Sequence, residues 1–182
     1  MKKILIFVII LSALKGFAQT KTIDSLKKAI DNYKKDDSIK IKMLYWYGFL
    51  LQETDIDASI RYTREGLQLA NKLNRLDIVS FGDLRLSYLY GSANKEDSAI
   101  FVALQELTAS ERLHLENLAD NFYALLGEHY RLLHNYEQAE YYDNKYLDAA
   151  ISQKNHSMTL LALLHLMSLY RQQDQGDKVK NI

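Results

Sequence analysis

The stretch Leu126-Gly127-Glu128-His129-Tyr130 decides the fold, because its apolar, small and aromatic positions recur along the chain at one spacing. Forty residues earlier stands Leu86-Ser87-Tyr88-Leu89-Tyr90, and forty residues later stands Leu166-Met167-Ser168-Leu169-Tyr170. A further forty residues toward the N-terminus lies Trp46-Tyr47-Gly48-Phe49-Leu50. Residues of small or modest size follow each stretch at a constant offset, namely Ser59, Ala99, Ala139 and Val179. Self-similarity at one period indicates a chain built from repeated supersecondary units.

Each repeated unit is predicted to be a pair of helices, because apolar residues recur three and four positions apart. The breaks expected within the pairs are 53–57, 91–96, 134–135 and 173–177, which are rich in Gly, Asn and Asp. Ser38 and Ser157 are expected to be N-caps, and 22–35 is expected to form one more helix. The expected core stripes include Ile39, Met43, Trp46, Tyr47, Leu50, Ile78, Phe81, Leu86, Leu89, Tyr90, Leu118, Phe122, Leu125, Leu126, Tyr130, Leu160, Leu163, Leu164, Met167 and Tyr170.

The predicted fold class is all-α, a right-handed α-solenoid of about four antiparallel helix hairpins with a 40-residue period. A lone hairpin cannot bury both of its apolar faces, so neighbouring pairs must stack into one continuous core. The chain has 182 residues and no proline, which favours long unbroken helices. Gly127 with Ala139, and Ser87 with Ala99, are expected to let the two helices of a hairpin approach closely.

Several solenoid families, including HEAT-like arrays, have a helix pair of about this length. Tyr123-x-x-Leu126-Gly127-x-x-Tyr130, with Ala139 nine residues later, resembles the signature of the tetratricopeptide repeat. Residues 58–70 and 135–142 resemble the second helix of that repeat. The period of 40 rather than 34, the missing proline, and Asp83 where an aromatic residue is expected are similar to the longer-helix variants of the family.

The resemblance implies a protein-binding surface and not a catalytic one. In this family the inner surface of the curve is lined by first helices and binds extended segments of partner proteins. The partner-binding residues that this implies are Gln52, Tyr88, Glu128, Arg131, Arg171 and Gln172, with Leu51 beside them. Arg131 and Arg171 share a phase of the repeat, so an arginine there is expected to fork onto a partner carboxylate. A solvated charged face is the alternative interpretation of the same residues.

The first 18 residues are predicted to be a secretory signal peptide. A basic start, Met1-Lys2-Lys3, precedes an apolar run over 4–14 and the small residues Gly16 and Ala18. The expected organisation is therefore 1–18 signal peptide, 19–37 N-terminal helix and 38–182 repeat array with an incomplete last repeat. The mature chain has 20 basic and 23 acidic residues, and this mild acidity excludes an electrostatic footprint for nucleic acid. An exported protein, periplasmic or at a bacterial cell surface, is expected.

The residue pattern contains no candidate catalytic, metal-binding or cofactor-binding site. Cysteine is absent, and the five histidines have no metal-ligand spacing. The acidic pairs Asp36-Asp37 and Asp55/Asp57 stand at predicted helix starts, where acidic side chains cap exposed amides. No glycine-rich phosphate-binding motif occurs. The 13 tyrosines lie mostly at core phases of the repeat, which favours packing over ligand binding.

Two functions are consistent with these features. The first is a non-catalytic exported scaffold that binds another protein or peptide. The second is the extracytoplasmic sensory region of a truncated membrane signalling protein, a histidine kinase or a transcriptional regulator, because similar arrays occur there. Contact with a membrane is expected only through the signal peptide or a missing C-terminal region. The chain stops early in the second helix of the last repeat, so self-association through that uncapped repeat is a further expectation.

Overall fold

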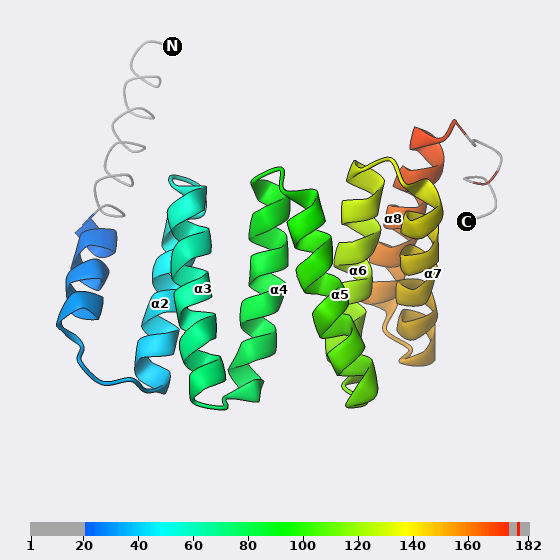
Figure 1. Ribbon diagram of the computed structural model, residues 1–182. Helices are drawn as coiled ribbons and strands as arrows, with labels where there is room; N and C mark the ends of the chain where they lie inside the picture. The colour runs from blue at the N-terminus through cyan, green and yellow to red at the C-terminus, as the bar shows by residue number, and fades with distance from the viewer. Residues whose placement is uncertain (1–20, 175–177, 179–182) are drawn as a thin grey trace, which may run out of the picture. The chain divides into compact units, whose positions relative to one another are not determined.

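The computed structural model describes residues 21–174 and Lys178, except for the side chains of Leu76 and Asp77. The described part is all-α, which confirms the predicted fold class (Figure 1). The predicted signal peptide, 1–18, lies outside the described residues. The helices fall into two compact units that divide between Leu76 and Asp77.

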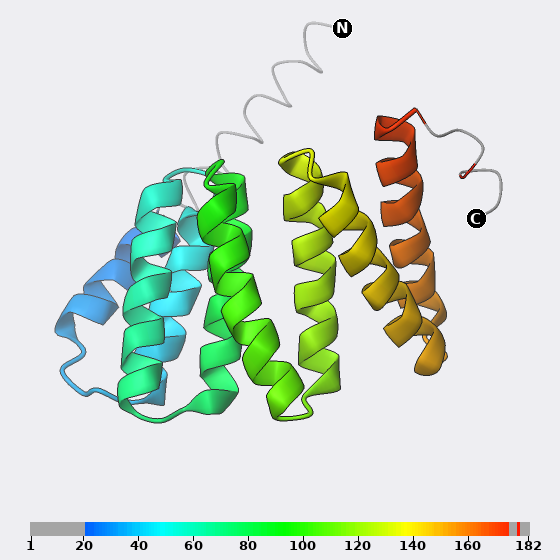
Figure 2. The same cartoon turned by 45° about the vertical axis from the view of Figure 1, so that its right-hand side comes forward.

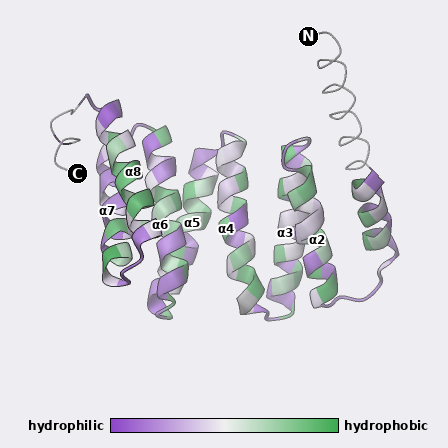
Figure 3. Cartoon of the chain, turned by 180° about the vertical axis from the view of Figure 1, so that it is seen from behind, coloured by the Kyte–Doolittle hydropathy of each residue, from purple (hydrophilic) through white to green (hydrophobic). Residues whose placement is uncertain are grey.

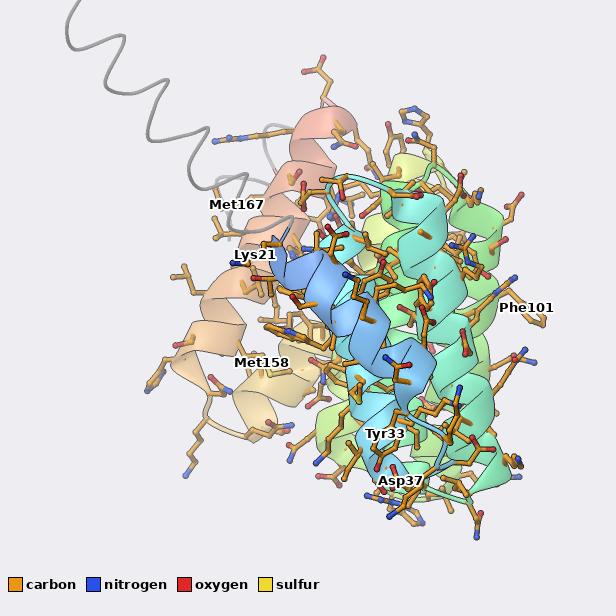
Figure 4. All side chains as sticks on the ribbon, turned by 90° about the vertical axis from the view of Figure 1, so that its left-hand side faces the viewer. Lys21, Tyr33, Asp37, Phe101, Met158 and Met167 are labelled. Atoms are coloured by element: carbon orange, nitrogen blue, oxygen red, sulfur yellow. The ribbon has the colours of Figure 1, made fainter. Side chains whose placement is uncertain are left out.

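Unit 1 contains a helix over residues 21–32, then α2 (Ser38–Leu51) and α3 (Ile56–Lys72). Helices α2 and α3 pack against each other around Ile41, Leu44 and Ala70, which are fully buried. The approach is close because Ser59 Oγ of α3 donates a hydrogen bond to the Gly48 carbonyl of α2 at 2.7 Å. Tyr33 follows the helix over residues 21–32, and its hydroxyl donates a hydrogen bond to Asp37 Oδ2 at 2.7 Å (Figure 4).

Unit 2 contains five helices of equal length joined by short turns. They are α4 (Leu76–Ser92), α5 (Glu96–Arg112), α6 (Glu116–Leu132), α7 (Tyr136–Ser152) and α8 (His156–Gln172). From α5 to α8, consecutive helices pack against each other, and α6 also contacts α8. Figure 2 shows α6 in yellow-green running antiparallel to α7 in gold. Unit 2 is therefore a solenoid-like stack of helices.

The core of unit 2 lies along these helix seams. One cluster joins α5 to α6 and contains Ile100, Ala103, Leu107, Ala119, Phe122 and Leu126. A second cluster joins α7 to α8 and contains Ala139, Leu166, Leu169 and Tyr170. The prediction that tyrosines pack is confirmed: Tyr90 and Tyr170 are buried, and Tyr130 stacks on Tyr142 at 5.6 Å between ring centroids.

Small residues do bring the hairpin helices together. Ser87 Oγ of α4 donates to the Ala99 carbonyl of α5 at 3.0 Å, which confirms the predicted close approach of that pair. The nearest neighbour of Gly127 on α7 is Asp143: a Cβ added at Gly127 would overlap Asp143 Oδ1 and lie 2.9 Å from its Cγ. The space beside Gly127 therefore holds a buried carboxylate.

Two kinds of local prediction were wrong. The N-caps are Asp37 and Asn155, not Ser38 and Ser157, because their side-chain oxygens accept from the amides of the first helical turn. Among the expected core residues, five have at least half of their surface exposed: Ile39, Trp46, Phe81, Leu160 and Leu164. Helix α8 has more apolar positions than one packed face can cover, and hydrophobic residues show on the side of α8 seen in Figure 3.

Candidate functional site

The candidate site is an apolar groove of about 380 Å³ on unit 2. Phe81, Leu84, Arg85 and Tyr88 come from α4, and Asn121, Ala124 and Leu125 come from α6. Tyr146 of α7 and Leu161 of α8 complete the lining. Phe81 and Tyr88 keep 55% and 51% of their surface exposed, so two aromatic side chains are open to an occupant. We call this set of nine residues the apolar groove.

The repeat places these residues on one surface. Phe81, Asn121 and Leu161 are forty residues apart, as are Leu84 and Ala124 of the neighbouring helices. Equal positions in equal helices point in the same direction when the helices stack in register. Since α6 contacts α8 directly, these two first helices lie side by side, and residues of α4, α6 and α8 line the groove together.

Two polar hollows continue from the groove. The bridging hollow, about 370 Å³, shares Asn121, Tyr146 and Leu161 with the groove. The acidic hollow, about 340 Å³, lies between α5, α6 and α7 and is named for its carboxylates, Glu111, Glu116 and Asp120. It shares Asp120 and Gln153 with the bridging hollow. The bridging hollow therefore adjoins both the groove and the acidic hollow through shared lining residues.

A chain of buried hydrogen bonds joins α4, α5 and α6. Glu96 Oε2 lies 2.7 Å from His129 Nδ1, and His129 Nε2 lies 3.2 Å from Ser87 Oγ. The order of the groups is that of a serine–histidine–carboxylate relay. The Ser87 side chain, however, is fully buried and donates its hydroxyl proton to the Ala99 carbonyl. This arrangement stabilises the helix packing and gives a substrate no access to the hydroxyl.

A second buried network links α6, α7 and α8. Arg131 Nη1 donates to Asp143 Oδ2 at 3.2 Å and to the His165 carbonyl at 3.4 Å. Arg131 is only 9% exposed and Asp143 is fully buried. The expectation that Arg131 offers its guanidinium to a partner was wrong, because the side chain is committed to an internal carboxylate that the sequence spacing does not reveal.

The remaining predicted site residues divide between the two units. Tyr88 lies in the apolar groove. Glu128, Arg171 and Gln172 are exposed on α6 and α8, outside the lining of the groove. Gln52 is half-buried at the C-cap of α2 in unit 1. The structure thus brings only Tyr88 of the six into the groove.

Sequence reasoning missed most of the groove. The sequence pattern places Phe81 and Leu125 in the core stripes and gives Asn121, Tyr146 and Leu161 no binding role. The forty-residue spacing of Phe81, Asn121 and Leu161 is nevertheless visible in the sequence. Whether residues at this spacing face the core or the open surface depends on how the first helices of neighbouring hairpins pack together.

The described residues, 21–174 and 178, contain no group of three or more His, Asp or Glu residues arranged to hold a metal ion. In the same part of the chain, no helix has both the length and the apolar character needed to cross a bilayer. Comparison of the chain with protein-family models finds no match, and comparison with curated proteins finds no relative.

Proposed function

We propose that this chain is a non-catalytic helical-repeat scaffold that binds a segment of another protein in the apolar groove of unit 2. The observation that carries the proposal is the pair of exposed aromatic rings, Phe81 and Tyr88, beside the apolar Leu125 and Leu161. Exposed aromatic side chains in a concave apolar lining are typical of surfaces that desolvate on binding a partner.

The wider assignment rests on the sequence pattern. The forty-residue hairpin period and the Gly127 signature support a tetratricopeptide-like repeat of the longer-helix type. The basic, apolar and small-residue order of 1–18 supports export to the periplasm or cell surface of a bacterium. An exported scaffold of this kind binds its partner outside the cytoplasm.

A peptide-display library selected on the full chain tests the proposal. Selected peptides should bind with micromolar Kd, and Leu161→Glu should weaken them at least tenfold, because it puts a charge on the apolar lining. Leu132→Glu is the matched control, since Leu132 is exposed on α6 outside the groove. Equal affinity of wild type and Leu161→Glu, or equal loss in both variants, would exclude the groove as the binding site.

A further inference from the structure

The carboxyl group of Asp120 lies at the junction of the acidic and bridging hollows, and only 7% of Asp120 is exposed. Its Oδ2 accepts a hydrogen bond from Gln153 Nε2 at 2.6 Å. Burial raises the pKa of the Asp120 carboxyl, and the nearby Glu116 adds to that rise. Among the described residues no basic side chain forms an ion pair with Asp120. A buried carboxylate without a cation is electrostatically costly until a cation reaches it.

A second polar group in the acidic hollow also lacks a partner. Ser110 is 1% exposed, and its Oγ makes no hydrogen bond to any residue that the structure describes. Buried hydroxyl groups are normally hydrogen-bonded, so Ser110 Oγ leaves one hydrogen-bonding group at the wall of the acidic hollow unsatisfied. Ser110 Oγ can accept a hydrogen bond as well as donate one.

The remaining charges of the acidic hollow favour a positively charged group. Glu111, Glu116 and Asp120 contribute three carboxylates, against one ammonium group from Lys145. The Tyr123 hydroxyl donates to Glu111 Oε1 at 2.7 Å, which holds that carboxylate at the wall of the hollow. A guanidinium group carries five N–H donors and therefore matches this set of carboxylate and hydroxyl acceptors.

We propose that the acidic hollow binds the guanidinium group of an arginine side chain that belongs to the peptide segment lying in the apolar groove. The inference rests on the proposed function, because the bridging hollow connects the two sites through Asn121, Tyr146 and Asp120. An apolar side chain of the segment occupies the groove, and the arginine extends past Asn121 to Asp120. The site thus selects a partner segment that has an apolar anchor and an arginine.

Three blocked amino acids test the inference on the full chain, with binding followed by NMR shifts of assigned backbone amides. They are the N-acetyl methylamides of phenylalanine, of arginine, and of citrulline, which has arginine's shape without its charge. The phenylalanine compound should shift amides around the groove. The arginine compound should shift those of Ser110, Asp120 and Gln153, with at least tenfold higher affinity than citrulline. Asp120→Asn should remove that preference, whereas Asp148→Asn, at an exposed position of α7, should keep it.

Each other outcome has a distinct meaning. Equal binding of arginine and citrulline, with phenylalanine still bound in the groove, overturns the arginine site and leaves the proposed function standing. Absence of binding by all three compounds counts against both. Equal loss of arginine binding in Asp120→Asn and Asp148→Asn overturns the site, because it reports only the overall charge. Tighter binding of free L-arginine than of its blocked form overturns the peptide assignment in favour of a free amino acid. The arginine–citrulline comparison on the wild-type chain needs no variant to fold.

Discussion

At the scale of single residues, two carboxyl groups meet between α4 and α5. Asp83 and Glu106 share a hydrogen bond, and Ser80 Oγ donates to Glu106 Oε2 at 3.3 Å. Burial, reinforced by the charge and hydrogen bond of Glu106, raises the pKa of Asp83 to about 7. A carboxyl group whose pKa is higher in the folded chain than in the unfolded chain binds its proton more tightly when folded.

The folded chain should therefore lose stability as the pH rises from about 4 to about 7. Over that range the unfolded chain releases the Asp83 proton first, so deprotonation favours unfolding. Asp83→Asn removes this titration and should raise the free energy of unfolding at pH 8 by about 1–4 kcal/mol, since one pKa unit corresponds to ~1.4 kcal/mol. Urea denaturation at pH 4.5 and pH 8 measures the difference, which should be small at the lower pH.

The exposed Asp148 offers the same chemical change without burial, so Asp148→Asn should leave the difference between the two pH values unaltered. If Asp83→Asn destabilises the chain at pH 8, the two carboxyl groups do not repel each other in the folded state. Asp83 would then contribute through a hydrogen bond that asparagine cannot replace.

The prediction that acidic residues cap helix starts is confirmed, because local chemistry decides it. Asp37 and Asp55 do cap helices, because an acidic side chain before a helix reaches its free amides without help from distant residues. Arg131 failed for the opposite reason: its partner, Asp143, comes from the next helix. Tyr88 and Arg131 both lie on first helices of hairpins. Only the packing of the neighbouring helices leaves the Tyr88 side chain exposed and buries that of Arg131.

At the scale of the element, the turns repeat every twenty residues. One residue with positive φ ends each helix from α3 to α8: Asn74, Asn94, His114, His134, Lys154 and Asp174. In the five turns after α3 to α7, the amide of the next residue donates to a carbonyl of the last helical turn, as Asn155 N does to Ala150 O at 3.0 Å. This is the Schellman arrangement, which most often uses glycine, and none of these six positions is glycine.

Lys154 is the turn residue least suited to its conformation, because its φ of 54° suits glycine or asparagine better than a long side chain. Lys154→Gly should raise the free energy of unfolding by about 0.5–1 kcal/mol. This net gain is the left-handed backbone strain that glycine relieves, reduced by the extra conformational entropy that glycine loses on folding. Thermal unfolding followed by circular dichroism measures this change. Lys154→Ala keeps the strain and should stay near wild type; an equal gain in both variants would assign the effect to the lost charge.

These turns explain why the sequence revealed the period of the hairpin but not the period of the helix. The turn positions are occupied by four residue types, so the twenty-residue repeat is conformational and leaves little trace in the residues. The hairpin period is visible because first and second helices bury different faces. The expected core stripes were too wide for the same reason: Phe81 and Leu160 have the spacing of buried residues but lie on faces that the next helix does not cover.

At the scale of the whole molecule, the helices of unit 2 form a series in which most packing joins neighbours in the chain. The stability of such an array is the sum of local helix terms and neighbour interfaces, so a defect has its greatest effect near its origin. Among the residues that the structure describes, Phe122 is the largest of the fully buried side chains, and it lies in the seam between α5 and α6. Phe101 lies on α5 and points away from the helix stack (Figure 4).

Phe122→Ala should cost about 3–5 kcal/mol through lost burial and the cavity left behind. Amide hydrogen exchange of the full chain should then accelerate most in α5, α6 and α7, and less in α8, because α8 keeps its own cluster with α7. Phe101→Ala removes the same ring from an exposed position and should leave exchange unchanged. Equal acceleration in every helix of unit 2 would mean that the unit opens only as a whole. A partner segment in the groove would then stabilise all five helices together instead of those it touches.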